Sequence, residues 1–335
     1  MSSNNLIPED IETDVRTAAS AMAELDRVLL AAHVNLDGDA LGSLGAAGWI
    51  YKALGKKFAI YCPNGVPAYL DFVNLPGAIY TSLDSLPFEP ETALYLDCSA
   101  KNRLGRELEE RSDALPSVNI DHHMTERGLG TLANLIVPHA AATCQLMAYV
   151  SLALNFKLEE PLSACLALGL MTDTGWFSHG NTSAEVLALC SLIVKNGFSL
   201  EKLREQLHNN WALGKMRLWG RLLSEVTLYG DRKIAFAAVS GEELRRYHCG
   251  KDDLEGLVEW FRRLRGVEVA AILREESENK CKFSLRSRGE VDVHSIAEAL
   301  NGGGHLHASG GSIELPLEEA KVVLLETIEK NLRLL

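Results

Sequence analysis

The chain has 335 residues, of which 47% are hydrophobic and 23% charged, a composition typical of a folded globular protein with a sizeable core. Its net charge of −12 excludes a protein that holds long duplex DNA through a broad basic face. A small phosphorylated substrate is compatible with this charge, because bound metal ions would reverse the potential locally.

The seven cysteines are scattered along the chain, and none forms a Cys-x-x-Cys pair. We therefore expect buried free thiols in a reducing cytoplasm, rather than a disulfide framework or a zinc knuckle. No apolar run reaches about 18 residues without a polar break, and residues 1–10 lack the pattern of a secretory signal. These features predict a cytoplasmic protein without a membrane span.

Helical and strand patterns alternate through the first half of the chain. Apolar residues at helical spacing predict a helix over residues 10–25, and the continuous apolar run at 27–33 predicts a strand buried on both faces. The other elements predicted in this half are a helix over 41–54 and strands over 58–61, 92–97 and 117–121. This alternation predicts an α/β fold in which a mostly parallel sheet has helices on both faces.

The second half changes from helical to β patterns. Helices are predicted over 143–154 and 162–170, over a segment that Asn181-Thr182-Ser183 caps and that runs to about Val194, and over 198–223. Hairpin patterns follow at 226–239 and 267–285, then a helix at 291–300 and a glycine-rich loop at 301–311. We expect an N-terminal domain at 1–194, a helical linker at 195–225 and a smaller C-terminal α/β domain at 226–335.

Carboxylates and imidazoles cluster at the predicted junctions of the first domain. The residues are His33, Asp37, Asp39, Asp97, Asp121, His122, His123 and Asp173. Singly, each fits an ordinary role, such as a turn at 37–39 or a helix cap at Asp97. Together they would converge at one edge of a parallel sheet, where the like charges repel unless cations hold them. The ligand types favour Mn²⁺ or Mg²⁺ over structural zinc, with enough donors for two ions.

These residues resemble a known family. His33-x-x-x-Asp37-Gly38-Asp39-Ala40, Asp97, Asp121-His122-His123 and Asp173-Thr174-Gly175 resemble the four motifs of the DHH phosphoesterases. Gly302-Gly303-Gly304-His305 and Ala308-Ser309-Gly310 resemble the glycine-rich signature of the DHH-associated domain. The resemblance covers nearly the whole chain and is strongest to the bacterial group of oligoribonucleases (nanoRNases) and pAp phosphatases.

The resemblance implies a two-metal site in the first domain. It assigns His33, Asp37 and Asp97 to one ion. The second ion would be held by Asp39, Asp97, His122 and Asp173, which makes Asp97 the bridging ligand. His123 would contact the scissile phosphate, with Asp121 orienting the imidazoles from behind. A hydroxide that bridges the ions would then attack phosphorus, and we expect Mn²⁺, with Mg²⁺ or Co²⁺ as alternatives.

The second domain is expected to hold the substrate, with the active site in the cleft between the domains. The candidate residues are Arg286, Ser287, Arg288, Gly302, Gly303, Gly304 and His305. The arginines suit phosphate, and the glycine run could form an anion nest, although a plain surface loop is the common alternative. Whether His307 or the basic cluster at 262–265 touches substrate stays open. His179 has no motif partner and is interpreted as a structural or surface residue.

Some positions depart from the family pattern without removing a metal ligand. Asn301 replaces a glycine, and asparagine tolerates positive φ better than most residues. Residues 141–143 replace a serine-rich stretch, which puts one hydroxyl contact in doubt. Because every ligand position is intact, we expect an active enzyme rather than a degenerate regulator.

The expected function is hydrolysis of very short oligoribonucleotides to mononucleotides and removal of the 3′-phosphate of pAp. A phosphodiesterase of signalling dinucleotides, such as pApA or cyclic di-AMP, is the alternative, and a catalytically silent nucleotide-binding regulator is a further one. The expected partners are these small substrates, with no long duplex DNA, no membrane and a homodimer through the N-terminal domain as an open possibility.

Overall fold

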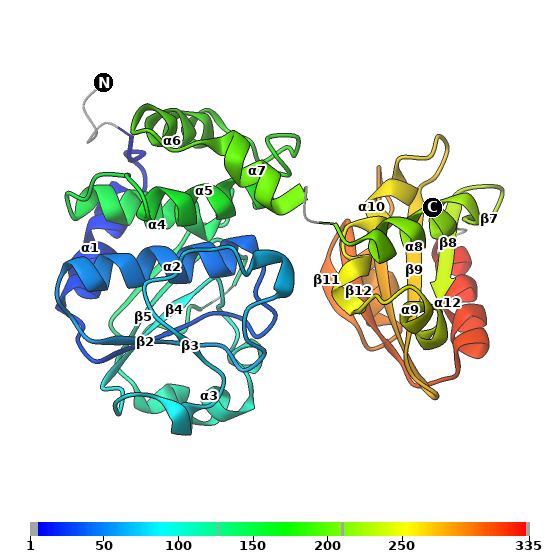
Figure 1. Cartoon of the computed structure of the whole chain (residues 1–335), viewed down its shortest axis with the longest axis horizontal. Helices are drawn as coiled ribbons and strands as arrows, with labels where there is room; N and C mark the ends of the chain where they lie inside the picture. Colours follow the sequence, from blue (N-terminus) through cyan, green and yellow to red (C-terminus); the bar gives the residue numbers. More distant parts are fainter. Residues whose placement is uncertain (1–5, 126, 209–210, 333–335) are drawn as a thin grey trace. The chain divides into compact units, whose positions relative to one another are not determined.

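The computed structural model describes residues 6–125, 127–208 and 211–332, and the chain forms two compact units (Figure 1). One unit covers residues 1–210 and the other covers 211–335. The segment 195–225, predicted as a separate linker, is instead divided between them. Helix α7 (Leu200–His208) packs on α5 (Leu162–Asp173) in the first unit, whereas α8 (Leu213–Ser224) contributes to a core of the second.

The first unit is built on a six-stranded sheet in which every strand pair is parallel. Its order is β3 (Ile79–Tyr80), β2 (Phe58–Tyr61), β1 (Val28–Ala31), β4 (Thr92–Leu96), β5 (Ser117–Asp121) and β6 (Ala133–Ile136). The four central strands were predicted, because their apolar runs are buried on both faces. The two edge strands were missed, since they are short and only partly buried.

Helices cover both faces of this sheet unequally (Figure 1). One face carries α1 (Glu12–Glu24), α2 (Gly38–Ala53) and α4 (Thr143–Ala153). Helix α5 packs on α2 and α4, and α6 (Ala184–Lys195) packs on α5. The opposite face is covered by the short α3 (Arg106–Arg111), with a smaller core around Tyr95 and Leu108. The predicted layers are therefore confirmed.

The second unit is built on a mixed six-stranded sheet. Its order is β11 (Gly303–His305), β12 (Ala308–Ile313), β10 (Lys280–Ser287), β9 (Val269–Ser277), β8 (Ile234–Val239) and β7 (Thr227–Tyr229). The β8–β9 pair is parallel and the others are antiparallel. The predicted hairpins are confirmed, but the glycine-rich stretch predicted as a loop forms β11 and part of β12.

Helices also lie on both faces of the second sheet. One core contains residues of α11 (Val293–Glu298) and α12 (Leu317–Leu332), and the other contains residues of α8, α9 (Gly241–Arg246) and α10 (Leu257–Arg262). The remaining short helical turns are 3₁₀: η2 (Ala68–Leu70), η3 (Leu83–Ser85), η4 (Lys101–Arg103), η5 (Ser112–Ala114) and η6 (Lys251–Leu254).

All seven cysteines are free and six of them are buried, as the sequence predicted. Within the described ranges, no helix combines the length and apolar character that crossing a membrane requires.

Candidate metal centre

Three neighbouring strands of the first unit deliver polar residues to one edge of the sheet. Strands β1, β4 and β5 are adjacent and parallel, so their carboxyl ends lie together. Asp97 directly follows β4 and His122 directly follows β5, while His33 lies two residues beyond β1. Asp173 does not follow a strand; it is the last residue of helix α5. The structure thus brings the polar residues of all the predicted junctions together at one edge of the sheet.

Asp37 is fixed by the helix that it begins. As the N-cap of α2, its Oδ1 accepts hydrogen bonds from the backbone N–H groups of Asp39 (3.1 Å) and Ala40 (3.0 Å). Its other oxygen, Oδ2, lies 3.6 Å from Nε2 of His33. The cap therefore leaves one carboxylate oxygen directed to the candidate centre.

Asp39 is held by the start of a second helix. Both its oxygens accept backbone N–H groups from the first turn of α4, at 2.6 Å from Thr143 and 2.8 Å from Cys144. The positive end of the α4 dipole also favours a carboxylate there. Helix α5 approaches closely, since a Cβ on Gly169 would lie 2.3 Å from Asp39 Oδ1. The buried Asp39 therefore has little freedom to move.

Asp97 occupies an unusual backbone conformation. Its φ is 54°, in the left-handed region that aspartate tolerates better than most residues. The buried side-chain amide of Asn119 holds this turn by donating to the carbonyls of Tyr95 (3.0 Å) and Cys98 (3.1 Å). The hydroxyl of Thr143 donates to Asp97 Oδ1 at 2.9 Å. The Asp97 carboxylate is therefore positioned by contacts from β5 and α4.

The first group of possible metal ligands is His33, Asp37 and Asp97. Nε2 of His33 lies 3.3 Å from Asp97 Oδ2 and 3.6 Å from Asp37 Oδ2. One nitrogen and two carboxylate oxygens, all within 4.8 Å of one another, suit a divalent cation.

The second group is Asp39, His122 and Asp173. Nε2 of His122 lies 3.8 Å from Asp39 Oδ2 and 3.4 Å from Asp173 Oδ2. It also lies 3.5 Å from Asp97 Oδ1, so Asp97 contacts both groups through different oxygens. Asp97 thus has one oxygen near the imidazole of each group. The assignment of each ligand to an ion stays a prediction.

The pKa values of Asp39, Asp173 and His33 are all raised, which shows that this cluster favours positive charge. Burial, and then the charges of Asp97 and Asp37, raise the pKa of Asp39 well above its usual value. Burial and the neighbouring aspartates, Asp39 first, likewise raise the pKa of Asp173. Burial alone would lower the pKa of His33, but its contacts with Asp37 and Asp97 outweigh burial and raise it to about 9. Without a cation, the fold therefore retains protons here.

His123 and Asp121 form a pair beside the ligands, and Nδ1 of His123 also lies 3.4 Å from Asp97 Oδ1. Nδ1 of His123 lies 2.8 Å from Asp121 Oδ1, and Ser99 donates to Asp121 Oδ2 at 2.5 Å. The hydrogen bond to Asp121 raises the pKa of His123. Burial would raise the pKa of Asp121, but its hydrogen bonds with His123 and Ser99 lower it. The pair therefore favours an imidazolium next to a carboxylate.

Asp121 supports only one of the two imidazoles that the sequence assigned to it. The ring nitrogen Nδ1 of His122 lies 3.3 Å from the carbonyl of Ala140 instead. That contact directs Nε2 of His122 to the carboxylates, because the two ring nitrogens point in different directions.

Several supporting residues were missed from the sequence. Thr143, Ser99 and Asn119 contact the predicted ligands or their turns, and only their tertiary positions show this. His179, interpreted as having no partner at the site, places Nδ1 3.1 Å from the carbonyl of Asp173. Asn181 donates to the same carbonyl at 3.1 Å.

Replacing Thr143 with Val is expected to weaken metal binding by about tenfold or more, because the isosteric side chain cannot donate to Asp97. Metal affinity can be measured by competition with a fluorescent chelator. Thr143→Ser keeps the hydroxyl and serves as the matched control. Equal affinities for wild type and Thr143→Val would show that this hydrogen bond does not position the carboxylate.

The predicted phosphate-binding residues at the end of β10 differ in accessibility. Arg286 is 31% exposed and Arg288 is exposed. Ser287 is fully buried, and its hydroxyl donates to the Val291 carbonyl at 2.7 Å and lies 2.9 Å from Nδ1 of His307. A direct contact of Ser287 with substrate is therefore not supported, because no part of its side chain reaches the surface of the unit.

The glycine run has a structural explanation that the sequence did not show. A Cβ on Gly302 would lie 2.4 Å from the Gly310 carbonyl oxygen, and one on Gly304 would lie 2.5 Å from that of Ala308. These residues are therefore glycines because β11 and β12 approach closely. Asn301 has a φ of 56°, as predicted from its tolerance. Since β11 is an edge strand, its outer backbone groups remain a candidate surface for ligand.

Each of the two units matches a domain of a known family. Residues 27–170 match the N-terminal domain of the DHH family, and residues 233–333 match the DHHA1 domain. The bifunctional oligoribonuclease and PAP phosphatase NrnA of Thermus thermophilus is 30% identical, over 91% of this chain and 90% of its own. The protein of the same name from Bacillus subtilis is 27% identical, over 91% and 96%.

A solved structure shows the same fold. The exopolyphosphatase-related protein of Bacteroides fragilis matches with a TM-score of 0.86 and 27% identity, covering 95% of this chain and 96% of that one. With the two domain matches, the 30% identical relative and the motifs assembled at the sheet edge, the chain belongs to the DHH phosphoesterase family, in the group that carries a C-terminal DHHA1 domain.

Proposed function

We propose that this protein hydrolyses very short oligoribonucleotides to mononucleotides and removes the 3′-phosphate of pAp, with divalent metal ions. The observation that carries the proposal is the shared carboxylate of Asp97, which contacts the imidazoles of His33 and His122 from two ligand groups. Such paired groups suit two ions acting on one phosphate ester. Two relatives that match 91% of the chain are named for both activities.

We propose that the ligand groups hold two ions, with Mn²⁺ as the expected metal because imidazole and carboxylate occur together. One ion is assigned to His33, Asp37 and Asp97, and the other to Asp39, Asp97, His122 and Asp173. When bound, such ions polarise phosphoryl oxygens and lower the pKa of water. The supporting observation is the raised pKa of Asp39 and Asp173, which burial and then the charges of the neighbouring aspartates cause, since a cation would stabilise the ionised carboxylates.

His123 is proposed to donate a hydrogen bond to a phosphoryl oxygen as negative charge develops there. Its contact with Asp121 favours the protonated ring, and a charged donor binds an anionic oxygen more strongly than a neutral one does. Asp121 keeps the ring in place and balances its charge. Arg286, on the second unit, is proposed to hold another part of the substrate, because its guanidinium is partly exposed.

The test is a panel of substrates with and without Mn²⁺: pAp, pApA, cyclic di-AMP, a five-residue RNA and single-stranded DNA. We expect metal-dependent release of mononucleotides from the five-residue RNA and of phosphate from pAp, both abolished by a chelator. Turnover of pApA or cyclic di-AMP in preference to the five-residue RNA and pAp would favour a phosphodiesterase of signalling dinucleotides instead. If nothing turns over while Asp97→Ala keeps nucleotide binding, the protein is a regulator and not an enzyme.

We also propose that the protein acts in the cytoplasm, where its seven free thiols would stay reduced. Small substrates fit its acidic character, since a net charge of −12 disfavours long nucleic acids. A homodimer through the first unit stays a prediction.

A further inference from the structure

Asp173 is the least supported of the four candidate ligand carboxylates. The other three accept hydrogen bonds from backbone N–H groups or from the hydroxyl of Thr143. Within the described residues, the Asp173 carboxylate is paired with a single group, the His122 ring, whose Nε2 lies 3.4 Å from Oδ2. Asp173 also ends α5, where the negative end of the helix dipole disfavours a carboxylate. Its position must therefore be fixed through the backbone.

The backbone carbonyl of Asp173 is held by two side chains from the following loop. The last four carbonyls of a helix lack partners within the helix. In α5 the first three of these, at residues 170–172, accept backbone N–H groups of residues 174–176. The fourth, that of Asp173, accepts from Nδ2 of Asn181 at 3.1 Å and lies 3.1 Å from Nδ1 of His179. These two side chains therefore complete the end of the helix that carries the ligand.

A left-handed turn leads the chain from Asp173 to these side chains. Gly175, Trp176 and Phe177 have φ values of 53°, 59° and 64°, a run that is costly for the two aromatic residues. A Cβ on Gly175 would lie 2.3 Å from Nε2 of His179, so the His179 ring packs directly on the turn. Strained backbone persists only where its surroundings determine it. The turn is therefore determined by the contacts around it, including that with His179.

The Asn181 amide also reaches the segment that orients the other ligands of the second group. Its Nδ2 carries two hydrogens, and it donates to the carbonyl of Ala141 at 3.2 Å as well as to that of Asp173. The segment around Ala141, residues 140–144, already contacts the three other proposed ligands of the second ion: Asp39, Asp97 and His122. One segment thus contacts three ligands directly and Asp173 through Asn181.

We propose that Asn181 is a positioning residue for the second metal ion, because it fixes the Asp173 end of α5 to the segment 140–144 that holds the other three ligands. This inference rests on the proposed assignment of two ions. The first ion depends less on this link, because His33 and Asp37 are held by each other and by the start of α2.

Calorimetric titration of the metal-free protein with Mn²⁺ counts the ions that bind and measures each affinity. We expect wild type to bind two ions, and Asn181→Ala to bind one of them about tenfold to a hundredfold more weakly, with little change for the other. Asn181→Asp keeps the shape but replaces the donor with an acceptor, so its loss should be at least as large. Electron paramagnetic resonance should show a coupled pair of Mn²⁺ ions in wild type and, at the same Mn²⁺ concentration, a single uncoupled ion in Asn181→Ala.

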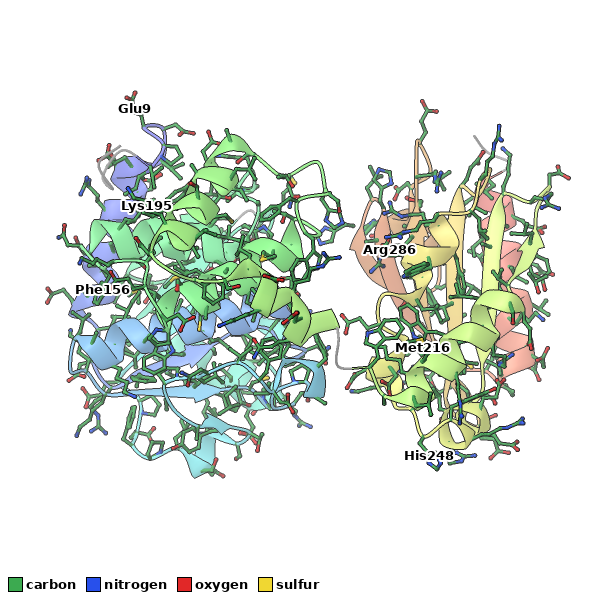
Figure 2. The ribbon with its side chains drawn as sticks, turned by 45° about the horizontal axis from the view of Figure 1, so that its top comes forward. Glu9, Phe156, Lys195, Met216, His248 and Arg286 are labelled. Carbon is green, nitrogen blue, oxygen red and sulfur yellow. The ribbon has the colours of Figure 1, made fainter. Side chains whose placement is uncertain are left out.

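Asn196→Ala is the matched control. Asn181 and Asn196 lie beyond opposite ends of α6, whose last residue, Lys195, is labelled in Figure 2. The Asn196 amide likewise donates to a carbonyl distant in sequence, that of Leu158 at 2.9 Å, but it has no contact with the candidate ligands. We expect this variant to bind both ions as wild type does. Equal metal binding in wild type and Asn181→Ala, or equal losses in Asn181→Ala and Asn196→Ala, would overturn the proposal.

A double-mutant cycle shows whether Asn181 acts through Asp173. Asp173→Asn is expected to weaken binding of the second ion by itself. Adding Asn181→Ala should then weaken it little further, because the ligand that Asn181 positions is already lost. Additive losses would contradict the proposal, because Asn181 would then act independently of Asp173.

Metal binding needs no substrate, which separates this inference from the proposed function. If wild type binds two ions and Asn181→Ala loses one, but no substrate is hydrolysed, the proposed function fails and the positioning role stands. If wild type binds only one Mn²⁺ ion, there is no second ion for Asn181 to position, and the inference fails even if pAp is hydrolysed.

Discussion

Replacing Asp97 with Asn is expected to lower kcat by about a thousandfold or more in the presence of Mn²⁺. Asp97 is the residue whose two oxygens contact both ligand groups, at 3.3 Å from His33 Nε2 and 3.5 Å from His122 Nε2. Asparagine keeps the shape and tolerates the positive φ of 54°. The substitution therefore removes the bridging charge with little effect on the backbone.

The measurement is the initial rate of pApA hydrolysis at saturating Mn²⁺, together with the metal content of the purified protein. Asp113→Asn is the control, because Asp113 pairs with Lys101 on the surface and not with the cluster. The control is expected to keep wild-type activity. An Asp97→Asn variant that keeps more than about a tenth of kcat would show that no bridging carboxylate is needed.

The ligands of the candidate centre could be predicted because they follow buried strands. Continuous apolar runs identify β1, β4 and β5, and parallel strands bring their carboxyl ends to one edge. The motif around Asp37 and Asp39 adds the start of α2, which lies at the same edge. Asp173 was grouped with these residues as a further junction, and the structure places it at the end of helix α5 and not at the end of a strand.

The residues that position the ligands could not be predicted in the same way. Thr143 is 104 residues away from Asp39 in the sequence, and its role depends on where α4 begins in the fold. Similarly, Gly302 and Gly304 fit either an anion-binding loop or a tight hairpin, and only the pairing of β11 with β12 decides between them. Both cases depend on contacts between distant segments, which a local pattern does not contain.

The boundary between the units falls inside the segment 195–225 that the sequence predicts as a linker. Residues 198–223 have helical spacing throughout, so they were interpreted as one linker. Helix α7 instead places Leu203 in the core of the first unit, and α8 places Leu218 and Leu222 in a core of the second. Periodicity identifies a helix, but the partner that buries its apolar face assigns it to a domain.

The stabilisation of the fold by divalent metal is expected to grow as pH rises from about 6.5 towards 9. In the metal-free protein, the pKa of His33 is raised from 6.5 to about 9 by Asp37 and Asp97. A raised pKa means that the folded state holds a proton that the unfolded state releases. This contribution is fully present below pH 6.5 and is lost as pH rises through about 9, which costs about 3 kcal/mol at most.

Metal binding changes with pH in the opposite direction. A ligand histidine must be neutral and ligand carboxylates must be ionised, so affinity rises as His33, Asp39 and Asp173 lose protons. At a metal concentration of about 100 times Kd, binding adds about 2.7 kcal/mol to stability. The metal-free protein thus weakens over the pH range in which the metal-bound protein gains stability.

The measurement is the difference in thermal unfolding midpoint between protein with Mn²⁺ and protein with chelator, at several pH values from about 6.5 to 8.5. His33→Asn should reduce the pH dependence, because one of the groups whose proton competes with the metal is gone. His139→Asn is the matched control, since the His139 side chain is 69% exposed and contacts Asp10. A difference that stays constant or shrinks with rising pH would show that protons and metal do not compete for His33.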